Sequence, residues 1–121
     1  MEIEVSIGEV VDKLSILKIK KDKIKDEEKL ANIMKEYNYL KDKLGDIVHE
    51  EYIFKLYLLN LELWEIEDEI RDLERKKDFH LRFLHIARSI YRLNDKRAAL
   101  KKQINLKYGS NFVEEKSYSA Y

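Results

Sequence analysis

Charged side chains that could hold a metal ion and a phosphate group are concentrated in two neighbouring stretches of the sequence. The first has one basic residue, Arg71, among seven acidic ones: Glu62, Glu65, Glu67, Asp68, Glu69, Asp72 and Glu74. The second has one acidic residue, Asp95, among eight basic ones: Arg82, Arg88, Arg92, Lys96, Arg97, Lys101, Lys102 and Lys107. Carboxylates bind Mg²⁺ and arginines bind phosphate oxygens, so the two stretches together could hold a phosphate-bearing ligand.

The acidic stretch allows two interpretations. On a helix, Glu62, Glu65 and Glu69 share one face, as do the carboxylates with which helical nucleotide pyrophosphohydrolases bind Mg²⁺ and a diphosphate. Those enzymes present acidic pairs from two helices, however, and the second stretch offers only Asp95. In the other interpretation, the charges flank a helix–helix seam and fix its register. We assign no metal ligand and no catalytic residue, and we expect Mg²⁺ only if the chain is such an enzyme.

Arg97 is the charged residue whose position is most informative. It falls on the apolar seam of its helix, opposite Leu59. A charge at such a position either forms a buried ion pair that specifies the packing register or binds an anionic ligand. Under the second interpretation, the candidate ligand-binding residues are Arg88, Arg92, Arg97, Lys101, Glu65 and Asp68.

Four helices are expected to position these residues, over residues 6–25, 27–44, 50–76 and 79–108. Ser6 followed by Glu9 is a capping box, and Asp26 is suited to cap the second helix. Gly45 would end that helix, and Asp78 would cap the fourth. Proline is absent and glycine occurs three times, which favours long uninterrupted helices.

Apolar residues at steps of three and four pair these helices into two antiparallel hairpins. In the first hairpin, Val10, Leu14 and Leu17 would face Leu44, Leu40 and Tyr37 across a turn near residue 27. In the second, Tyr52, Leu56, Leu63, Ile66 and Ile70 would face Ile104, Leu100, Leu93, Ile90 and Ile86. This register places Arg88 opposite Asp68 and Arg92 opposite Trp64. A constant register along both pairs predicts an all-α, four-helix bundle-like fold in one domain, residues 1–121.

The segment Tyr52–Trp64 is expected at the centre of the fold because it has two apolar sides. One side faces the fourth helix, and the other, Phe54, Tyr57, Leu61 and Trp64, needs cover from the first hairpin or a second subunit. The helices of the second hairpin would span about 40 Å, against roughly 27 Å for the first. Because part of the long hairpin then lacks cover, we expect a homodimer. The non-helical tail, residues 109–121, is apolar enough to pack on the bundle or on a partner.

The composition argues against several classes of function. Lysine plus arginine number 24, as do aspartate plus glutamate, so no net charge attracts nucleic acid or an anionic membrane. Cysteine is absent, and His49, His80 and His85 lack the spacing of metal ligands. No uncharged apolar run reaches the roughly 18–20 residues that cross a bilayer, and the N-terminus lacks a signal-peptide pattern. We therefore expect a cytoplasmic protein.

Four segments together resemble a family of small all-helical proteins of unknown function from bacteria and their phages: GEVVDKL at residues 8–14, LWEIEDEIR at 63–71, ARSIYRLNDKRAALK at 87–101 and GSNFVEEKSY at 109–118. The resemblance implies no activity. It draws attention to polar residues of those segments: Glu9, Asp12, Lys13, Glu65, Asp68, Arg71, Arg88, Asn94, Asp95, Arg97, Lys101, Glu115, Lys116 and Tyr118. If the tail folds back, Glu114 or Glu115 could pair with Arg97 or Lys101.

Two functions remain open from the sequence. The first is a non-catalytic helical assembly or protein-interaction module, with the long hairpin as the interface of a homodimer or with another protein. The alternative is a small enzyme or binding protein for a phosphate-bearing ligand, such as a nucleotide or nucleotide sugar. In that case Arg88, Arg92 and Arg97 would contact the anion, and Glu65 and Asp68 would act as metal ligands or bases.

Overall fold

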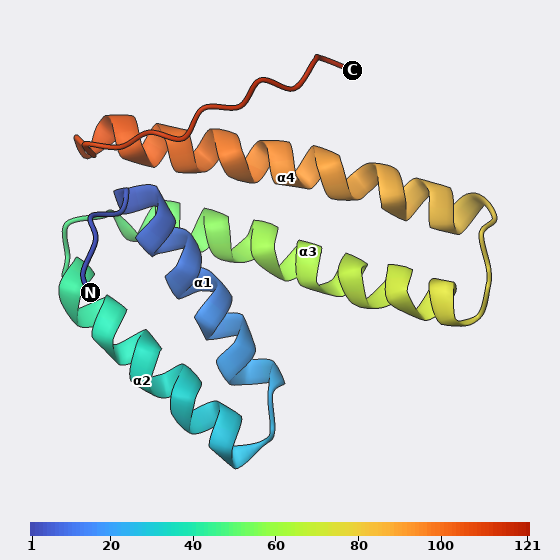
Figure 1. Ribbon diagram of the computed structural model, residues 1–121, viewed down its shortest axis with the longest axis horizontal. Helices are drawn as coiled ribbons and strands as arrows, with labels where there is room; N and C mark the ends of the chain where they lie inside the picture. Colours follow the sequence, from blue (N-terminus) through green and yellow to red (C-terminus); the bar gives the residue numbers. More distant parts are fainter.

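The computed structural model describes residues 1–121 and contains four helices and no strand (Figure 1). The helices are α1 (Ile7–Lys23), α2 (Glu27–Leu44), α3 (Glu50–Arg75) and α4 (Leu81–Lys107). Their ends agree with the expected ends to within two residues, and the all-α, bundle-like fold is confirmed. None of the helices combines the length and apolar character that crossing a bilayer requires.

The helix ends follow the local sequence with one exception. Ser6 Oγ accepts the N–H three residues later at 3.2 Å, and Asp26 Oδ1 does the same at 3.0 Å. Gly45 ends α2 with φ +58°, in the region that favours glycine. The expectation that Asp78 caps α4 is wrong, because the N-cap is His80, whose side chain makes no capping bond. Asp78 instead accepts the backbone N–H of His80 at 3.3 Å.

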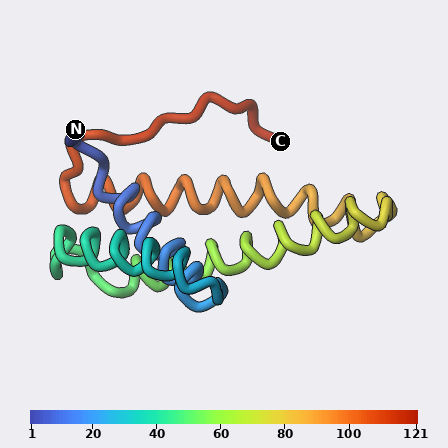
Figure 2. The backbone as a smooth tube through the Cα atoms, turned by 60° about the horizontal axis from the view of Figure 1, so that its bottom comes forward, coloured from blue at the N-terminus to red at the C-terminus, as the bar shows by residue number.

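Two antiparallel hairpins cross each other (Figures 1 and 2). The short hairpin is α1 with α2, and the long hairpin is α3 with α4. Helix α1 lies against all three other helices, whereas α2 packs along α1. The central element is therefore α1 and not the segment Tyr52–Trp64 of α3, where Phe54 remains 58% exposed.

The core lies where α1 crosses the long hairpin. Seven buried residues form it: Val11, Leu14, Leu44, Val48, Leu56, Leu100 and Ile104. On α1, a line of residues four apart, Val11, Ser15 and Ile19, is buried toward the long hairpin. Because Leu14 and Leu17 form a second buried line on the α2 side, α1 is covered on two faces.

The long hairpin is covered by α1 on one face only. Asn60 of α3 marks the covered face, because it bonds to Asp12 of α1. Glu69 follows Asn60 by nine residues, about two and a half turns, and so lies on the opposite side of α3. There it pairs across the hairpin with Arg82 of α4 at 2.7 Å. Helical spacing extends this second side, which we call the open face: Leu58, Glu62, Glu65 and Glu69 of α3 with Arg82, Arg92, Lys96 and Ala99 of α4. All of them are exposed except Glu69, which is half-buried.

Candidate functional site

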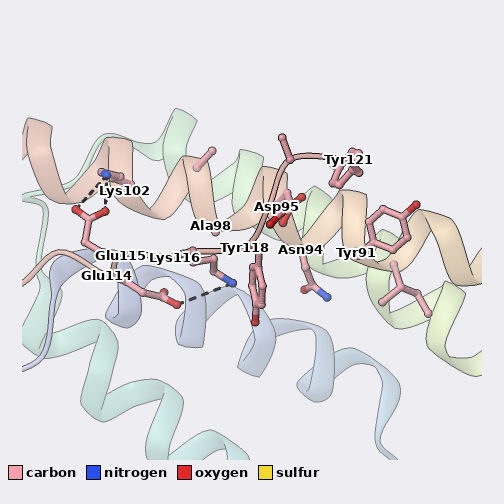
Figure 3. A pocket seen from close by; sticks show the side chains of 14 residues that line it. Tyr91, Asn94, Asp95, Ala98, Lys102, Glu114, Glu115, Lys116, Tyr118 and Tyr121 are labelled. Atoms are coloured by element: carbon pink, nitrogen blue, oxygen red, sulfur yellow. Dashed lines mark hydrogen bonds and ion pairs between the residues drawn. The ribbon is translucent and has the colours of Figure 1, made fainter.

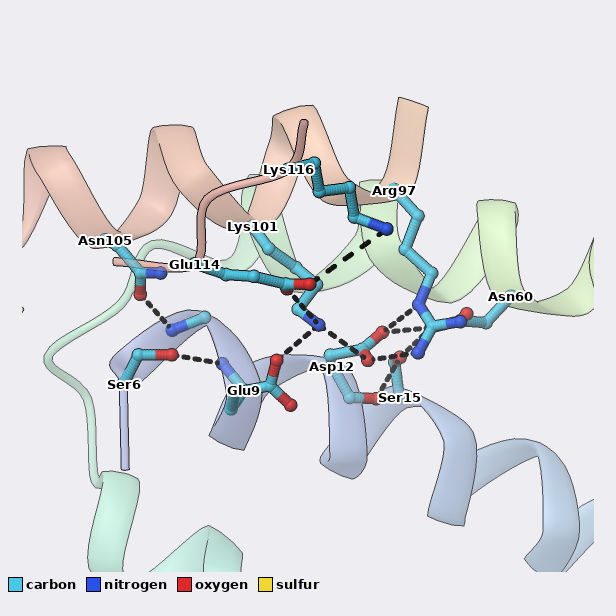
Figure 4. A network of polar contacts seen from close by, with 11 residues as sticks. Ser6, Glu9, Asp12, Ser15, Asn60, Arg97, Lys101, Asn105, Glu114 and Lys116 are labelled. Carbon is cyan, nitrogen blue, oxygen red and sulfur yellow. Dashed lines mark hydrogen bonds and ion pairs between the residues drawn. The ribbon is translucent and has the colours of Figure 1, made fainter. Parts of the chain in front are cut away.

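The structure brings together only some of the six predicted ligand-binding residues. Arg97 and Lys101 converge from α4 on Asp12 of α1 (Figure 4). Asp68 lies at the side, lining a hollow that it shares with Arg97. The other three are exposed, lie outside this cluster and form no ion pair within the chain: Glu65, Arg88 and Arg92.

Asp12 is the acceptor at the centre of the cluster. Its side chain is 4% exposed, and Arg97 binds it with two parallel bonds, Nε to Oδ1 at 3.0 Å and Nη2 to Oδ2 at 2.6 Å. Asn60 of α3 donates to Oδ1 at 2.8 Å and to Ser15 Oγ at 2.7 Å. Ser15 donates in turn to the Asp12 carbonyl. One carboxylate therefore connects α1, α3 and α4.

Lys101 extends the cluster toward the tail. Its side chain is 11% exposed, and its Nζ lies 2.5 Å from Glu9 and 3.7 Å from both Asp12 and Glu114. Glu114 also lies 4.0 Å from Lys116. Three carboxylates and three cations thus alternate across the junction of α1, α4 and the tail, so the buried charges compensate one another.

Gly8 allows α1 to approach α4 closely at this junction. Its N–H donates to Asn105 Oδ1 at 2.6 Å. A Cβ at this position would lie 2.7 Å from the Lys101 carbonyl oxygen and 2.9 Å from Asn105 Oδ1. The close approach places the start of α1 against α4 and brings Glu9 and Asp12 to Lys101 and Arg97.

This arrangement suits a fixed joint better than a reaction centre. Every buried side-chain nitrogen or oxygen has a hydrogen-bond partner, and both cations that could bind an anion are paired with carboxylates. A bidentate pair is directional, so it fixes both the separation and the rotation of α1 relative to α4. The chemical role that the geometry supports is to set the angle between the two hairpins.

A hollow of about 290 Å³ lies where α1 diverges from the long hairpin. Its walls are Ile16 and Ile19 of α1 and Leu63 and Trp64 of α3, with polar groups at the edge: Asn60, Glu67, Asp68 and Arg97. The side chain of Arg97 is 28% exposed. Two carboxylates beside the guanidinium oppose an anionic ligand here.

The register places Arg88 opposite Asp68, but the two side chains form no ion pair, and Glu65 forms none either. Glu69 pairs instead with Arg82, whose guanidinium lowers the pKa of the Glu69 carboxyl. The reason is the direction in which the side chains project. Asp68 lies two residues from the seam residues Ile66 and Ile70, and two residues turn a side chain by about 200° around the helix axis. Arg88 has the same position on α4, between Ile86 and Ile90. Both side chains therefore project from the side of their helix that is opposite the seam. No three His, Asp or Glu side chains lie close enough together to hold a metal ion.

The tail runs back along α4 and encloses a second hollow of about 700 Å³ (Figure 3). Glu115 accepts two bonds from Lys102 Nζ, at 3.0 and 3.1 Å. At the end of the chain, the ring of Tyr121 meets that of Tyr91 at 5.1 Å, edge to face. These contacts hold the tail at both ends of the hollow.

Two tyrosines at the end of this hollow carry opposite pKa shifts. The carboxylate of Asp95 raises the pKa of the Tyr121 phenol, chiefly through a hydrogen bond. The guanidinium of Arg88, helped by that of Arg92, lowers the pKa of the Tyr91 phenol. Neither Arg88 nor Arg92 forms an ion pair within the chain.

Several residues of the joint were not predicted from the pattern of the sequence. Asp12 stood out only through the family resemblance and Glu9 through the resemblance and the capping box, whereas Gly8, Ser15, Asn60 and Asn105 were not singled out. The sequence of α1 does contain a signal for them. Val11, Ser15 and Ile19 are small or apolar residues at steps of four, and they lie beside Asp12. A second line of this kind predicts a second packed face, with Asp12 at its edge.

Comparison with known proteins gives a family but no activity. The profile of a family of unknown function, DUF6165, matches residues 1–121. No curated protein and no solved structure matches the chain. The match covers the whole sequence, including the four segments that carried the resemblance, and the chain belongs to this family of unknown function.

Proposed function

We propose that this protein is a non-catalytic helical assembly module that forms a homodimer through the open face of its long hairpin. The observation that carries the proposal is the one-sided cover of that hairpin. Its helices are 26 and 27 residues long, whereas α1 has 17 and crosses them on the face of Asn60. A hairpin of this length with one free face offers an extended surface for a partner.

The burial of the long hairpin supports the proposal. Beyond the crossing with α1, Ile66, Ile70 and Leu73 of the α3 seam are only half-buried. On the open face, Leu58 is 47% exposed. A second subunit over this face would remove apolar surface from water, at about 25 cal/mol per Å².

The joint around Asp12 supports an assembly role for a different reason. Its charged groups are paired with each other, so they hold the short hairpin at one angle and leave no free nucleophile or base among them. A rigid angle between the hairpins presents the open face in one orientation. A surface that is already organised loses less conformational entropy when it binds.

Light scattering coupled to size-exclusion chromatography tests the proposal. The measured mass should be twice 14.6 kDa at high protein concentration and should fall on dilution. A mass of 14.6 kDa at every concentration contradicts self-association.

A second candidate function, binding of a phosphate-bearing ligand, is favoured by one observation. Arg88 and Arg92 are exposed without an acidic partner and lower the pKa of Tyr91. Thermal denaturation with nucleoside triphosphates or nucleotide sugars, with and without Mg²⁺, tests this function. Stabilisation that is lost in Arg88→Gln would support ligand binding, and the same melting temperature in every condition would contradict it.

A further inference from the structure

We propose that the two subunits are related by a two-fold axis parallel to the long hairpin, so that the acidic α3 of each copy lies on the basic α4 of the other. In this arrangement Glu62 and Glu65 pair with Arg92 and Lys96 of the partner copy. The inference rests on the proposed self-association and specifies its orientation. It follows from the charges that the open face leaves unpaired.

The open face carries opposite charges on its two helices, and most of them have no partner. On α3, Glu62 and Glu65 are exposed and form no ion pair, and on α4 the same holds for Arg92 and Lys96. The pair Glu69–Arg82 is the single ion pair between the two helices. Each copy therefore presents a free acidic strip beside a free basic strip.

Charge decides between the two face-to-face arrangements of a symmetric dimer. An axis across the helices puts α3 on α3, and the strip with Glu62 and Glu65 then meets its own copy. An axis along the helices puts α3 on α4, so each acidic strip meets a basic one. Like charges placed together strongly oppose binding, whereas complementary charges favour it, so the second arrangement is preferred.

The register of the hairpin matches these partners in height. The register read from the sequence sets Leu63 opposite Leu93, both of which are buried, and so places Glu62 and Glu65 at the height of residues 91–94. Contacts at the two ends of the hairpin depart from this register in opposite directions, Tyr52 with Tyr108 by four residues and Glu69 with Arg82 by five, so the register holds at the middle of the hairpin, where Glu62 and Glu65 lie. An axis parallel to the helices preserves height, so Glu65 meets Arg92 of the partner copy, and Glu62 lies between its Arg92 and Lys96.

The same register places an apolar contact beside the charged one. Leu58 falls at the height of residues 98 and 99 on α4, and the exposed Ala99 lies where the open face borders the hollow under the tail. In the dimer, the large exposed side chain of Leu58 would rest on the small one of Ala99 in the partner copy. Both the charges and the side-chain sizes are therefore complementary in a single orientation.

Charge reversal and mixing test this orientation. The basic strip is reversed in Arg92→Glu with Lys96→Glu, and the acidic strip in Glu62→Lys with Glu65→Lys. Each variant alone should have a dimer dissociation constant raised by roughly 100-fold or more, since each brings like charges together. An equimolar mixture should restore a complex of wild-type affinity that contains one chain of each variant. Single reversals, Arg92→Glu and Glu65→Lys, serve in the same design if a double variant does not fold by circular dichroism.

A matched control for the variant Arg92→Glu with Lys96→Glu carries the same change in net charge away from the open face. Lys25→Glu with Lys35→Glu alters two exposed lysines that form no ion pair, and this variant should dimerise as the wild type does. Dimers that persist in both reversed variants, or that tighten in Glu62→Lys with Glu65→Lys, overturn the orientation but not self-association. A wild-type monomer at all concentrations overturns both proposals.

Discussion

Asp12 and Arg97, 85 residues apart in sequence, form a bidentate ion pair that joins α1 to α4, with bonds of 3.0 and 2.6 Å. Asn60 of α3 donates to the same carboxylate. Three helices therefore share one acceptor at the crossing of the two hairpins.

Replacement of Asp12 by asparagine should destabilise the fold. The change keeps the size of the side chain but removes the charge that compensates Arg97, and breaking a buried pair in this way costs about 3–5 kcal/mol. Because Arg97 is 28% exposed, we expect a loss of about 2–4 kcal/mol in the free energy of unfolding. Urea denaturation measures it. Glu115→Gln, at an exposed pair with Lys102, is the control and should cost about 0–1 kcal/mol. Equal stability of Asp12→Asn and wild type would show that the pair does not hold the joint.

Gly8→Ala should destabilise the protein even though alanine is the better helix former. The new Cβ would lie 2.7 Å from the backbone oxygen of Lys101, which cannot move without shifting α4. Overpacking of this kind typically costs about 1–3 kcal/mol. Thermal unfolding should show a lower melting temperature, whereas Asn32→Ala, at an exposed position of α2, should leave it unchanged or raise it. A higher melting temperature for Gly8→Ala would contradict the close approach of α1 to α4.

Leu58→Glu should weaken the dimer, and Leu84→Glu should not. The two leucines have similar exposure, 47% and 54%, but Leu58 lies on the open face. Leu84 lies seven residues before Tyr91, on the side of α4 that the tail follows. Sedimentation velocity of the two variants at the same concentrations compares them directly. If Leu84→Glu is the variant that dissociates, the interface lies on the tail side of the hairpin.

The tail should loosen from α4 at high pH. Asp95 raises the pKa of Tyr121, so the protonated phenol is the favoured form in the folded state. A raised pKa means that this contribution is fully present below the unfolded value of about 10 and is lost as pH rises through the folded value. Titration of the Tyr121 ring by NMR should give a pKa above 10 in the wild type and a lower one in Asp95→Asn. An identical Tyr121 pKa in both would mean that the tail does not rest on Asp95.

The elements of the fold were predictable because each depends on neighbours in sequence. Steps of three and four between apolar residues predict the four helices, and Ser6, Asp26 and Gly45 mark three of their ends. The antiparallel pairing followed from short connections and a constant register. These signals are local in sequence, so they can be recognised without knowing how the two hairpins cross.

The joint was only half predictable, because its partners come from different hairpins. An arginine on the seam at position 97 requires a compensating charge, but the sequence offers 24 acidic residues for it. Choosing Asp12 requires the crossing angle, which side-chain packing around Val11 and Leu56 determines. The error at Asp68 and Arg88 has a simpler cause: both lie two residues from the seam, where a helix turns them away from its partner.

Hydrogen exchange at two protein concentrations tests most directly whether the open face of the long hairpin is where this protein assembles. Peptides covering Leu58–Glu69 of α3 and Arg92–Ala99 of α4 should exchange more slowly in the concentrated sample, while α2 should exchange at the same rate in both. Protection that is independent of concentration, or that rises only in the short hairpin or at the tail, would contradict assembly through the open face.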